Sequence, residues 1–177
     1  MNNYFKEAAL EIKKTRTLTG AALATAFTVV VDFFKLVFTQ TMEVSFAFLG
    51  IVVAGMLYGP IVGGLVGAIA DIIGYFLRPT GAFFIGFTLN NIITGVIYGL
   101  FLYKKEPSLK RLALALLTEN IIVILILTPI WLNIMYGSSL FTIARVIRCV
   151  VLFPVKLIAM RAICKAIIAL KLGDKVA

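Results

Sequence analysis

The sequence of 177 residues contains no histidine, two cysteines and one tryptophan, and only 14% of its residues are charged. Without histidine or clustered cysteines it has no pattern of metal ligands. Cys149 and Cys164 lie in a single apolar segment, fifteen residues apart, so we expect no disulfide between them. A Gly-x-x-x-x-Gly-Lys-Ser/Thr phosphate loop and a serine in a nucleophile elbow are also missing. These absences argue against an ATPase, and an enzyme of any kind is not expected.

Apolar residues, by contrast, are abundant. They make up 62% of the chain, and the mean hydropathy is +1.06. A soluble domain of this length cannot bury so much apolar surface, because its surface-to-volume ratio is too high. No Pro/Gly/Ser-rich linker or charged block interrupts the apolar stretches. We therefore predict one all-α membrane domain over residues 1–177, with no cofactor.

The apolar stretches number six. A transmembrane helix needs about twenty apolar residues, or somewhat fewer when it tilts little. The second and third stretches meet at Tyr58-Gly59-Pro60, which indicates a tight turn because proline is tolerated at a helix start. The six predicted spans cover residues 17–37, 44–58, 61–77, 82–103, 111–134 and 139–168.

The net charge of +9 could suggest nucleic-acid binding, but the basic residues are distributed as a membrane topology signal. Twelve lie in the two tails and in the loop after the fourth span, whereas only Lys35 and Arg78 lie on the opposite side. Lys and Arg concentrate in cytoplasmic segments. We therefore predict that both termini are cytoplasmic, that residues 1–16 form a cytoplasmic amino tail without a signal peptide, and that the chain is multi-pass.

Small residues recur four positions apart. Examples are Gly63 with Gly67 and Gly95 with Gly99. In lipid, helices associate through close backbone approach, so packing within the chain is the simpler interpretation of these pairs. For Ala22 and Ala26 in the first span, packing against a partner subunit is a competing interpretation.

Charged groups at membrane depth are costly and usually face the bundle interior or water. Asp32 and Lys35, three residues apart, are expected to pair. We expect Asp71 and Glu119 to be satisfied by neighbouring helices. Lys156 is expected to snorkel or to pair with a carboxylate.

Arg145 and Arg148 lie one turn apart near the outer end of the sixth span, with no acidic residue nearby in the sequence. Such a pair is suited to binding an anionic ligand through charge-assisted hydrogen bonds. Snorkelling to outer lipid headgroups is the alternative, and the residues alone leave both open.

Aromatic residues gather at the predicted outer ends of the spans. An aromatic belt accounts for many of them, but a belt should be equally strong at both faces. The outer excess is also compatible with a pocket that stacks a flat ligand. The residues concerned are Phe33, Phe34, Phe38, Tyr75, Phe76, Phe83, Phe84, Phe87, Trp131, Tyr136 and Phe141.

Several segments together resemble the substrate-binding S components of energy-coupling-factor (ECF) importers, most closely their folate branch. The most specific is GAFFIGFTLNNIITGVIYG, from Gly81 to Gly99. The others are Ala54 to Pro60, Gly63 to Asp71, Arg145-Val146-Ile147-Arg148 followed by Pro154, and Ala22-x-x-x-Ala26. These segments are spread over most of the chain.

The resemblance implies six helices in a bacterial cell membrane and an outward pocket closed by external loops. It also implies docking on a transmembrane coupling protein driven by two ABC ATPases, with Ala22 and Ala26 facing that protein. Folate is the implied ligand. Its pterin would stack on side chains drawn from Phe34, Phe84, Phe87 and Trp131. The heterocycle edge would be contacted by Thr88, Asn90 and Asn91. The carboxylates would be bound by Arg145 and Arg148, with Arg78.

Other functions stay open. The chain could be an S component for pantothenate, riboflavin or a deazapurine. It could instead be a small transporter that works alone, or a structural membrane subunit that binds no small molecule.

Overall fold

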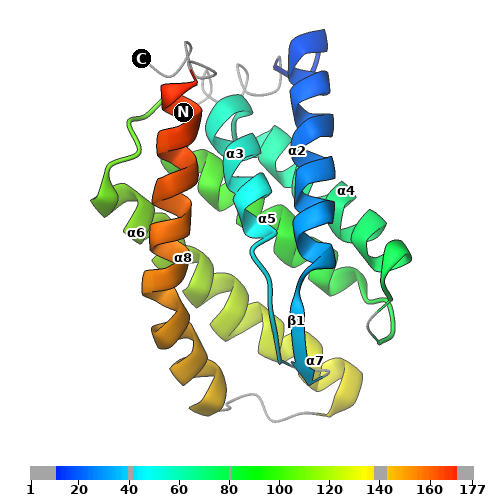
Figure 1. Ribbon diagram of the computed structural model, residues 1–177. Coiled ribbons are helices and arrows are strands. Elements are labelled where there is room, and N and C mark those ends of the chain that lie inside the picture. The colour runs from blue at the N-terminus through cyan, green and yellow to red at the C-terminus, as the bar shows by residue number, and fades with distance from the viewer. Residues whose placement is uncertain (1–10, 40–41, 80, 138–142, 171–177) are drawn as a thin grey trace.

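The computed structural model describes residues 11–39, 42–79, 81–137 and 143–170, and within these ranges the chain forms six helical columns (Figure 1). This confirms the predicted all-α, six-helix fold. The first four columns are α2 (Thr15–Phe33), α3 (Phe48–Tyr58), α4 (Pro60–Leu77) and α5 (Ile85–Leu102). The fifth is continuous from α6 (Leu109–Glu119) through the π-helical η1 (Asn120–Leu127) into α7 (Thr128–Tyr136), and the sixth is α8 (Ile143–Ala169).

A short hairpin replaces the ends of the first two predicted spans. The antiparallel strands β1 (Leu36–Thr39) and β2 (Met42–Val44) pair Leu36 with Val44. The prediction of helix up to residue 37 and again from residue 44 was wrong at these ends. Branched and aromatic residues in Leu-Val-Phe-Thr favour a strand as readily as they prolong an apolar run. As a result α3 has only 11 residues.

Four of the columns are long and apolar enough to cross a membrane: Thr15–Phe33, Pro60–Leu77, Ile85–Leu102 and Leu109–Tyr136. Helix α3 is apolar but shorter, and α8 is long but contains five basic residues. Many large apolar side chains, such as Phe76 and Ile158, are exposed on the outside of the bundle. This surface is the one expected of a protein surrounded by lipid.

Glycines allow α3, α4 and α5 to approach closely. A Cβ atom added to Gly63 would lie 2.8 Å from the carbonyl oxygen of Gly95, and one added to Gly55 would lie 2.9 Å from the amide nitrogen of Gly99. The four-residue spacings therefore serve packing within the chain, as predicted. The α3–α4 turn is formed by Gly59, which has a φ of 94°, and by Pro60 at the start of α4.

The fifth column changes its helical pitch halfway. The hydroxyl of Thr128 donates to the carbonyl of Val123, five residues earlier, at 2.7 Å. Pro129 follows and has no amide hydrogen to donate, which suits a segment where the regular bonding pattern changes. Gly137, with a φ of 60°, ends α7, whereas Ser138 and Ser139 of the predicted turn lie outside the described residues.

The beginning of α2 and the end of α8 lie at one end of the molecule, and the hairpin and α7 lie at the other (Figure 1). The arrangement agrees with the predicted topology, in which both tails share one side of the membrane. A core of Phe48, Met56, Tyr98, Leu112 and Met160 joins α3, α5, α6 and α8. We refer below to the end with the hairpin as the outer end.

Candidate ligand site

Three of the predicted aromatic residues gather where α5 begins and α7 lies beside it. The ring centroids of Phe84 and Trp131 are 5.7 Å apart, and those of Phe84 and Phe87 are 6.1 Å apart. Gly86 makes this contact possible, because a Cβ atom there would lie 2.7 Å from the Trp131 ring. All three side chains are half-buried, so they form an aromatic wall with accessible surface.

A hydrogen-bonded chain orients Trp131. Its indole nitrogen donates to Oδ1 of Asn90 at 3.0 Å, and the Asn90 amide donates to the hydroxyl of Thr128 at 3.1 Å. Asn90 is buried, with 6% of its surface exposed. The amide of Asn90 therefore ties α5 to α7 and fixes the plane of the tryptophan.

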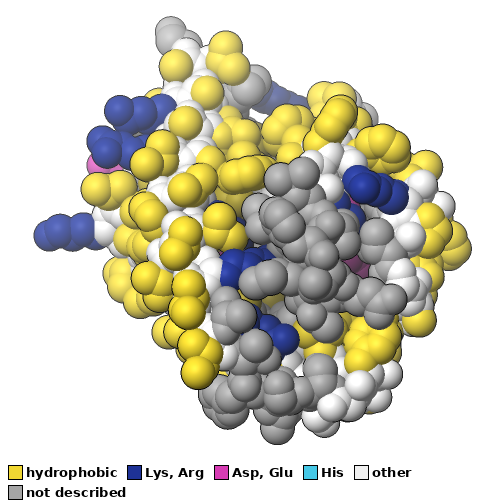
Figure 2. Space-filling view, turned by 60° about the horizontal axis from the view of Figure 1, so that its bottom comes forward, with side chains coloured by type: hydrophobic (Ala, Val, Ile, Leu, Met, Phe, Trp, Pro, Cys, Tyr) yellow, Lys and Arg dark blue, Asp and Glu magenta, His cyan; other side chains and the backbone are white. Residues whose placement is uncertain are grey.

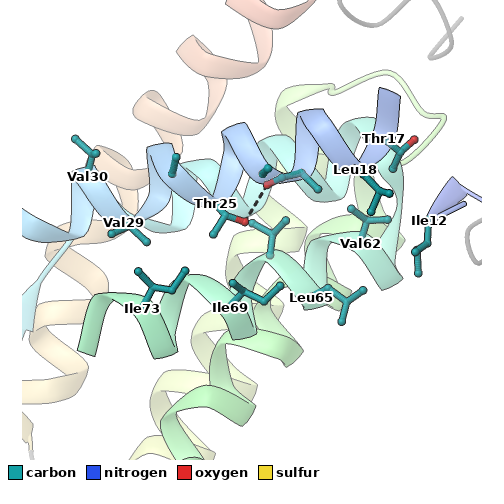
Figure 3. Close-up of a pocket in the computed structure, with 14 residues that line it drawn as sticks. Ile12, Thr17, Leu18, Thr25, Val29, Val30, Val62, Leu65, Ile69 and Ile73 are labelled. Atoms are coloured by element: carbon teal, nitrogen blue, oxygen red, sulfur yellow. Dashed lines mark hydrogen bonds between the residues drawn. The ribbon is translucent and has the colours of Figure 1, made fainter. Parts of the chain in front are cut away.

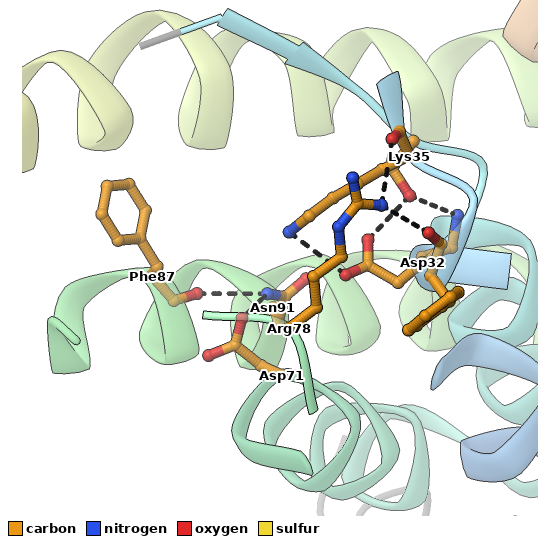
Figure 4. Close-up of polar contacts among 9 residues, drawn as sticks. Asp32, Lys35, Asp71, Arg78, Phe87 and Asn91 are labelled. Carbon is orange, nitrogen blue, oxygen red and sulfur yellow. Dashed lines mark hydrogen bonds and ion pairs between the residues drawn. The ribbon is translucent and has the colours of Figure 1, made fainter. Parts of the chain in front are cut away.

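A second network joins α4 to α5 around Asp71. The hydroxyl of Thr88 donates to one carboxylate oxygen at 2.6 Å, and the side-chain amide of Asn91 donates to the other at 2.8 Å. Figure 4 shows Asn91 between Asp71 and Phe87, whose carbonyl also accepts from the Asn91 amide at 3.3 Å. The expectation that neighbouring helices satisfy Asp71 is confirmed.

Polar contacts also close the outer end of α2. Asp32 pairs with Lys35 at 3.3 Å, as expected, and accepts from the hydroxyl of Ser45 at 2.9 Å. The guanidinium of Arg78 donates to the carbonyls of Phe33 and Lys35 and lies 5.8 Å from the centre of the Phe33 ring (Figure 4). These contacts hold the segments before and after the hairpin against α2 and α4.

Phe34 lies apart from the aromatic wall. It packs edge-on against Phe33, with ring centroids 6.1 Å apart, and 77% of its surface is exposed. Among the predicted site residues, Phe84, Phe87, Asn90 and Trp131 come together, and Thr88 and Asn91 bond to Asp71 beside them. Phe34 lies at the end of α2, and the Arg78 side chain reaches that end from the end of α4.

The two predicted arginines lie in the outer part of α8, and both are half-buried. The Nη1 nitrogen of Arg145 is buried and has no hydrogen-bond partner within the part of the chain that the structure describes. In Figure 2, which brings the outer end forward, basic side chains lie among mainly hydrophobic ones. A buried cationic donor without a partner is suited to binding an anion.

Deeper in the bundle lies a group that sequence reasoning treated differently. Glu119 is buried, and its Oε2 atom has no hydrogen-bond partner among the described residues, although we expected a neighbouring helix to satisfy it. One indication of basic residues on a shared helix face was available in the sequence but was not used to predict the site. Arg145 and Lys156 are eleven residues apart, about three helical turns, and so share one face of α8.

A separate groove runs along the outside of the molecule between α2 and α4 (Figure 3). Its volume is about 590 Å³, and its lining is almost entirely apolar. Thr25, which lies within it, donates its hydroxyl to the carbonyl of Ala21 at 2.8 Å and so offers little polarity. Ala22 and Ala26 are exposed and line the groove together with Val29, Leu65, Ile69 and Ile73.

Comparison with known proteins gives consistent matches over nearly the whole chain. The sequence profile of the family described as "ECF-type riboflavin transporter, S component" matches residues 12–177. Folate transporter FolT of Clostridium novyi (strain NT) is 32% identical over 168 residues, which cover 94% of this chain and 98% of that protein. Folate transporter FolT of Leuconostoc mesenteroides is 34% identical over 126 residues, covering 67% of this chain and 68% of that protein.

A solved structure gives the same relationship in three dimensions. The crystal structure described as FolT bound with folic acid matches with a TM-score of 0.77 and 36% sequence identity, covering 92% of this chain and 95% of that one.

The apolar helices and these matches together define a small membrane transport protein. Among the described residues, no three His, Cys, Asp or Glu side chains lie close enough to hold a metal ion. The chain belongs to the S components of ECF-type transporters, in the branch that contains the FolT folate transporters. It is a transporter subunit and not an enzyme.

Proposed function

We propose that this chain binds folate from outside a bacterial cell membrane and delivers it inward as the S component of an ECF importer. The observation that carries the proposal is the match to a FolT structure that holds folic acid, at 36% identity over 92% of this chain. The residues present suit such a ligand, because folate combines a flat heterocycle with carboxylates. Aromatic rings and arginines are the side chains that bind these two groups.

In this proposal Phe84, Phe87 and Trp131 stack on the ligand, and Arg145 and Arg148 bind its carboxylates. Charge-assisted bonds to a carboxylate are stronger than neutral ones, particularly away from water. Phe34, at the end of α2, and Arg78, whose side chain reaches that end from α4, would act at the rim of the site. Thr88, Asn90 and Asn91 already bond within the protein, so they would contact the heterocycle only through atoms left over, such as Oδ1 of Asn91.

Riboflavin is the second candidate, because the matching family profile is named for a riboflavin transporter. Riboflavin has a flat ring system but no carboxylate. An arginine pair therefore contributes less to riboflavin than to folate. If folate is the ligand, removing the charges of Arg145 and Arg148 should weaken its binding strongly. If riboflavin is the ligand, the same change should affect its binding little.

Trp131 provides the test, because it is the only tryptophan in the chain and belongs to the aromatic wall. The purified protein is titrated with folate, riboflavin, pantothenate and a deazapurine while its fluorescence is followed and corrected for ligand absorbance. Saturable quenching by folate, which the other compounds do not displace, supports the proposal. Saturable quenching by riboflavin that folate does not displace would replace folate with riboflavin as the ligand.

We also propose that the groove between α2 and α4 receives the transmembrane coupling protein, with Ala22 and Ala26 at the contact. Small side chains let a partner helix approach the backbone closely in lipid. The coupling protein and two ABC ATPases would then supply the energy for transport. Vesicles containing this chain alone should bind folate without accumulating it, whereas accumulation by the chain alone would indicate a self-sufficient transporter.

A further inference from the structure

Thr128 lies where the fifth column returns from its π-helical segment to a regular α-helix. Its backbone N–H and its hydroxyl both donate to the carbonyl of Val123, five residues earlier, and the hydroxyl does so at 2.7 Å. The next N–H that could continue this five-residue pattern would belong to Pro129, which has none. The sequence Thr128-Pro129 therefore fixes where the change of helical pitch ends.

The hydroxyl of Thr128 takes part in the chain to Trp131 in one direction only. A hydroxyl has a single hydrogen, and that of Thr128 is donated to Val123. Its oxygen can then only accept, so Asn90 must direct its Nδ2 amino group at Thr128, at 3.1 Å. This leaves Oδ1 of Asn90 facing Trp131, whose indole N–H is a donor and cannot accept. Every bond from Val123 to Trp131 thus has a determined direction.

The spacing of Thr128 and Trp131 lets a single amide reach both. The two residues belong to α7, and residues three apart on a helix lie on the same face. Asn90, on α5, bonds to one of them through each end of its amide. Because Asn90 is buried, water competes little for these bonds. The amide cannot turn over without losing two hydrogen bonds.

Packing alone restrains the Trp131 ring only in part. Phe84 touches it, with ring centroids 5.7 Å apart, and the backbone at Gly86 lies against it, since a Cβ atom there would be 2.7 Å from the ring. The hydrogen bond from the indole N–H adds a direction that these contacts lack. A stacking surface whose plane is fixed before the ligand arrives costs less entropy on binding than one that must first be ordered.

We propose that Thr128 is a positioning residue for the ligand site: its hydroxyl orients the Asn90 amide, and through that amide it fixes the plane of Trp131 for stacking on a flat ligand ring. Thr128 itself does not touch the ligand. The change of pitch in the fifth column has a role here, because the five-residue bond to Val123 makes the Thr128 oxygen an acceptor. The stacking role of Trp131 rests on the function proposed above, whereas its orientation by Thr128 does not.

The orientation of Trp131 can be tested without any ligand. Trp131 is the only tryptophan, so its indole N–H gives a single NMR signal whose hydrogen exchange with solvent can be measured. Thr128→Val, which replaces the hydroxyl with a methyl group, should speed this exchange by at least about fivefold. Thr128→Ser keeps a hydroxyl and should restore the wild-type rate. Thr118→Val is the matched control, because the Thr118 hydroxyl bonds to the Leu114 carbonyl within α6, and it should leave the rate unchanged.

Folate titration of the same variants by calorimetry tests the consequence for binding. Thr128→Val should weaken folate binding by about 3- to 10-fold, because the ring must then be ordered when the ligand binds. Thr128→Ser should recover the wild-type affinity, and Thr118→Val should keep it. Faster indole exchange in Thr128→Val with unchanged folate affinity would overturn the positioning role.

Two further measurements keep the test decisive if Thr128→Val fails to fold. Thr128→Ala removes the same hydroxyl without adding bulk and should show the same faster exchange. In the wild-type protein the indole N–H of Trp131 should exchange at least about tenfold more slowly than that of a short unstructured peptide. Exchange at the rate of the peptide, or equal rates in the wild type and Thr128→Ala, would overturn the inference. Wild-type protein that protects the indole N–H but binds no folate would overturn the proposed function, while the orientation of Trp131 by Thr128 would stand.

Discussion

Single residues of the same type have different surroundings in this bundle, and the arginines are the clearest case. Arg78 donates to two backbone carbonyls at the end of α2, where the last carbonyls of a helix lack partners within it. Arg145 keeps a buried guanidinium nitrogen without a partner among the described residues. We therefore expect Arg145 to contribute more to ligand affinity than Arg78, which holds the outer end of α2 in place.

Neutralising the arginines of α8 should weaken the binding of an acidic ligand in particular. We expect Arg145→Gln and Arg148→Gln each to weaken folate binding by about 10- to 100-fold, because each removes a charge-assisted bond to a carboxylate. Tryptophan fluorescence titration measures the effect. Arg161→Gln, at the exposed inner part of the same helix, should bind like the wild type. Full affinity in both variants would mean that the arginines interact with lipid headgroups.

Asp71 should matter more for stability than for binding. Asp71→Ala leaves the hydroxyl of Thr88 and the amide of Asn91 without their acceptor, at a cost of about 1–3 kcal/mol in the free energy of unfolding. Thermal unfolding in detergent should therefore show a lower midpoint. Thr19→Ala, which removes an exposed hydroxyl on α2, is the control. An unchanged midpoint for Asp71→Ala would show that the network contributes little.

Whether a residue's partners could be foreseen depended on where they lie. The salt bridge of Asp32 with Lys35 was predictable, because the two residues are only three apart in the sequence, at the end of the first span. It was also predictable that Asp71 would accept hydrogen bonds from a neighbouring helix, although not from which residues. The unpartnered oxygen of Glu119 was not predictable, because whether a buried carboxylate meets a donor depends on how the neighbouring helices pack.

Among the secondary-structure elements, α4 and α5 depend most visibly on small residues. Gly63 has backbone on two sides: a Cβ atom there would lie 2.8 Å from the Gly95 carbonyl and 2.9 Å from the Cα of Gly55. Backbone atoms in packed helices cannot move aside as a flexible side chain can. The three helices must therefore separate if this position gains a methyl group.

We expect Gly63→Ala to lower stability by about 1–3 kcal/mol, because it overpacks the contact among α3, α4 and α5. The same helix contains its own control. In Gly74→Ala the new methyl group would meet only a carboxylate oxygen of Asp32, at 3.6 Å, which is ordinary contact. Thermal unfolding of both variants measures the difference. Equal midpoints would show that α4 and α5 can move apart without cost.

The elements that the sequence did not reveal are the irregular ones. The continuous apolar stretches of the sequence located all six columns. It did not locate the hairpin of β1 and β2, because Leu-Val-Phe-Thr continues the apolar stretch of α2 without a break. The π-helical segment Asn120–Leu127 was also missed, because its residues are as apolar as their neighbours and only the bonding pattern differs.

At the scale of the whole molecule, two surfaces have separate roles in the proposed transport cycle. The aromatic wall lies between the start of α5 and α7, and the arginines lie in the outer part of α8, whereas the apolar groove lies outside between α2 and α4. No residue that lines the groove belongs to the proposed ligand site. Ligand binding and partner docking should therefore be separable by mutation.

Filling the groove should disrupt coupling and spare binding. We expect Ala26→Leu to reduce folate accumulation by at least about tenfold in vesicles that contain the coupling protein and ATPases, because a bulky side chain prevents close helix approach. Folate affinity in detergent should stay unchanged. Ala166→Leu makes the same substitution at an exposed position on α8, away from the groove, and should transport normally. Normal accumulation by Ala26→Leu would place the docking surface elsewhere.

The most direct test of the account is a calorimetric titration of the purified wild-type chain with folate, with riboflavin titrated in parallel. We predict saturable binding of one folate per chain and no binding of riboflavin. That result would assign the ligand of the aromatic wall and the α8 arginines. Saturable binding of riboflavin in its place, or no heat from folate at concentrations well above those that saturate a specific receptor, would contradict the proposal.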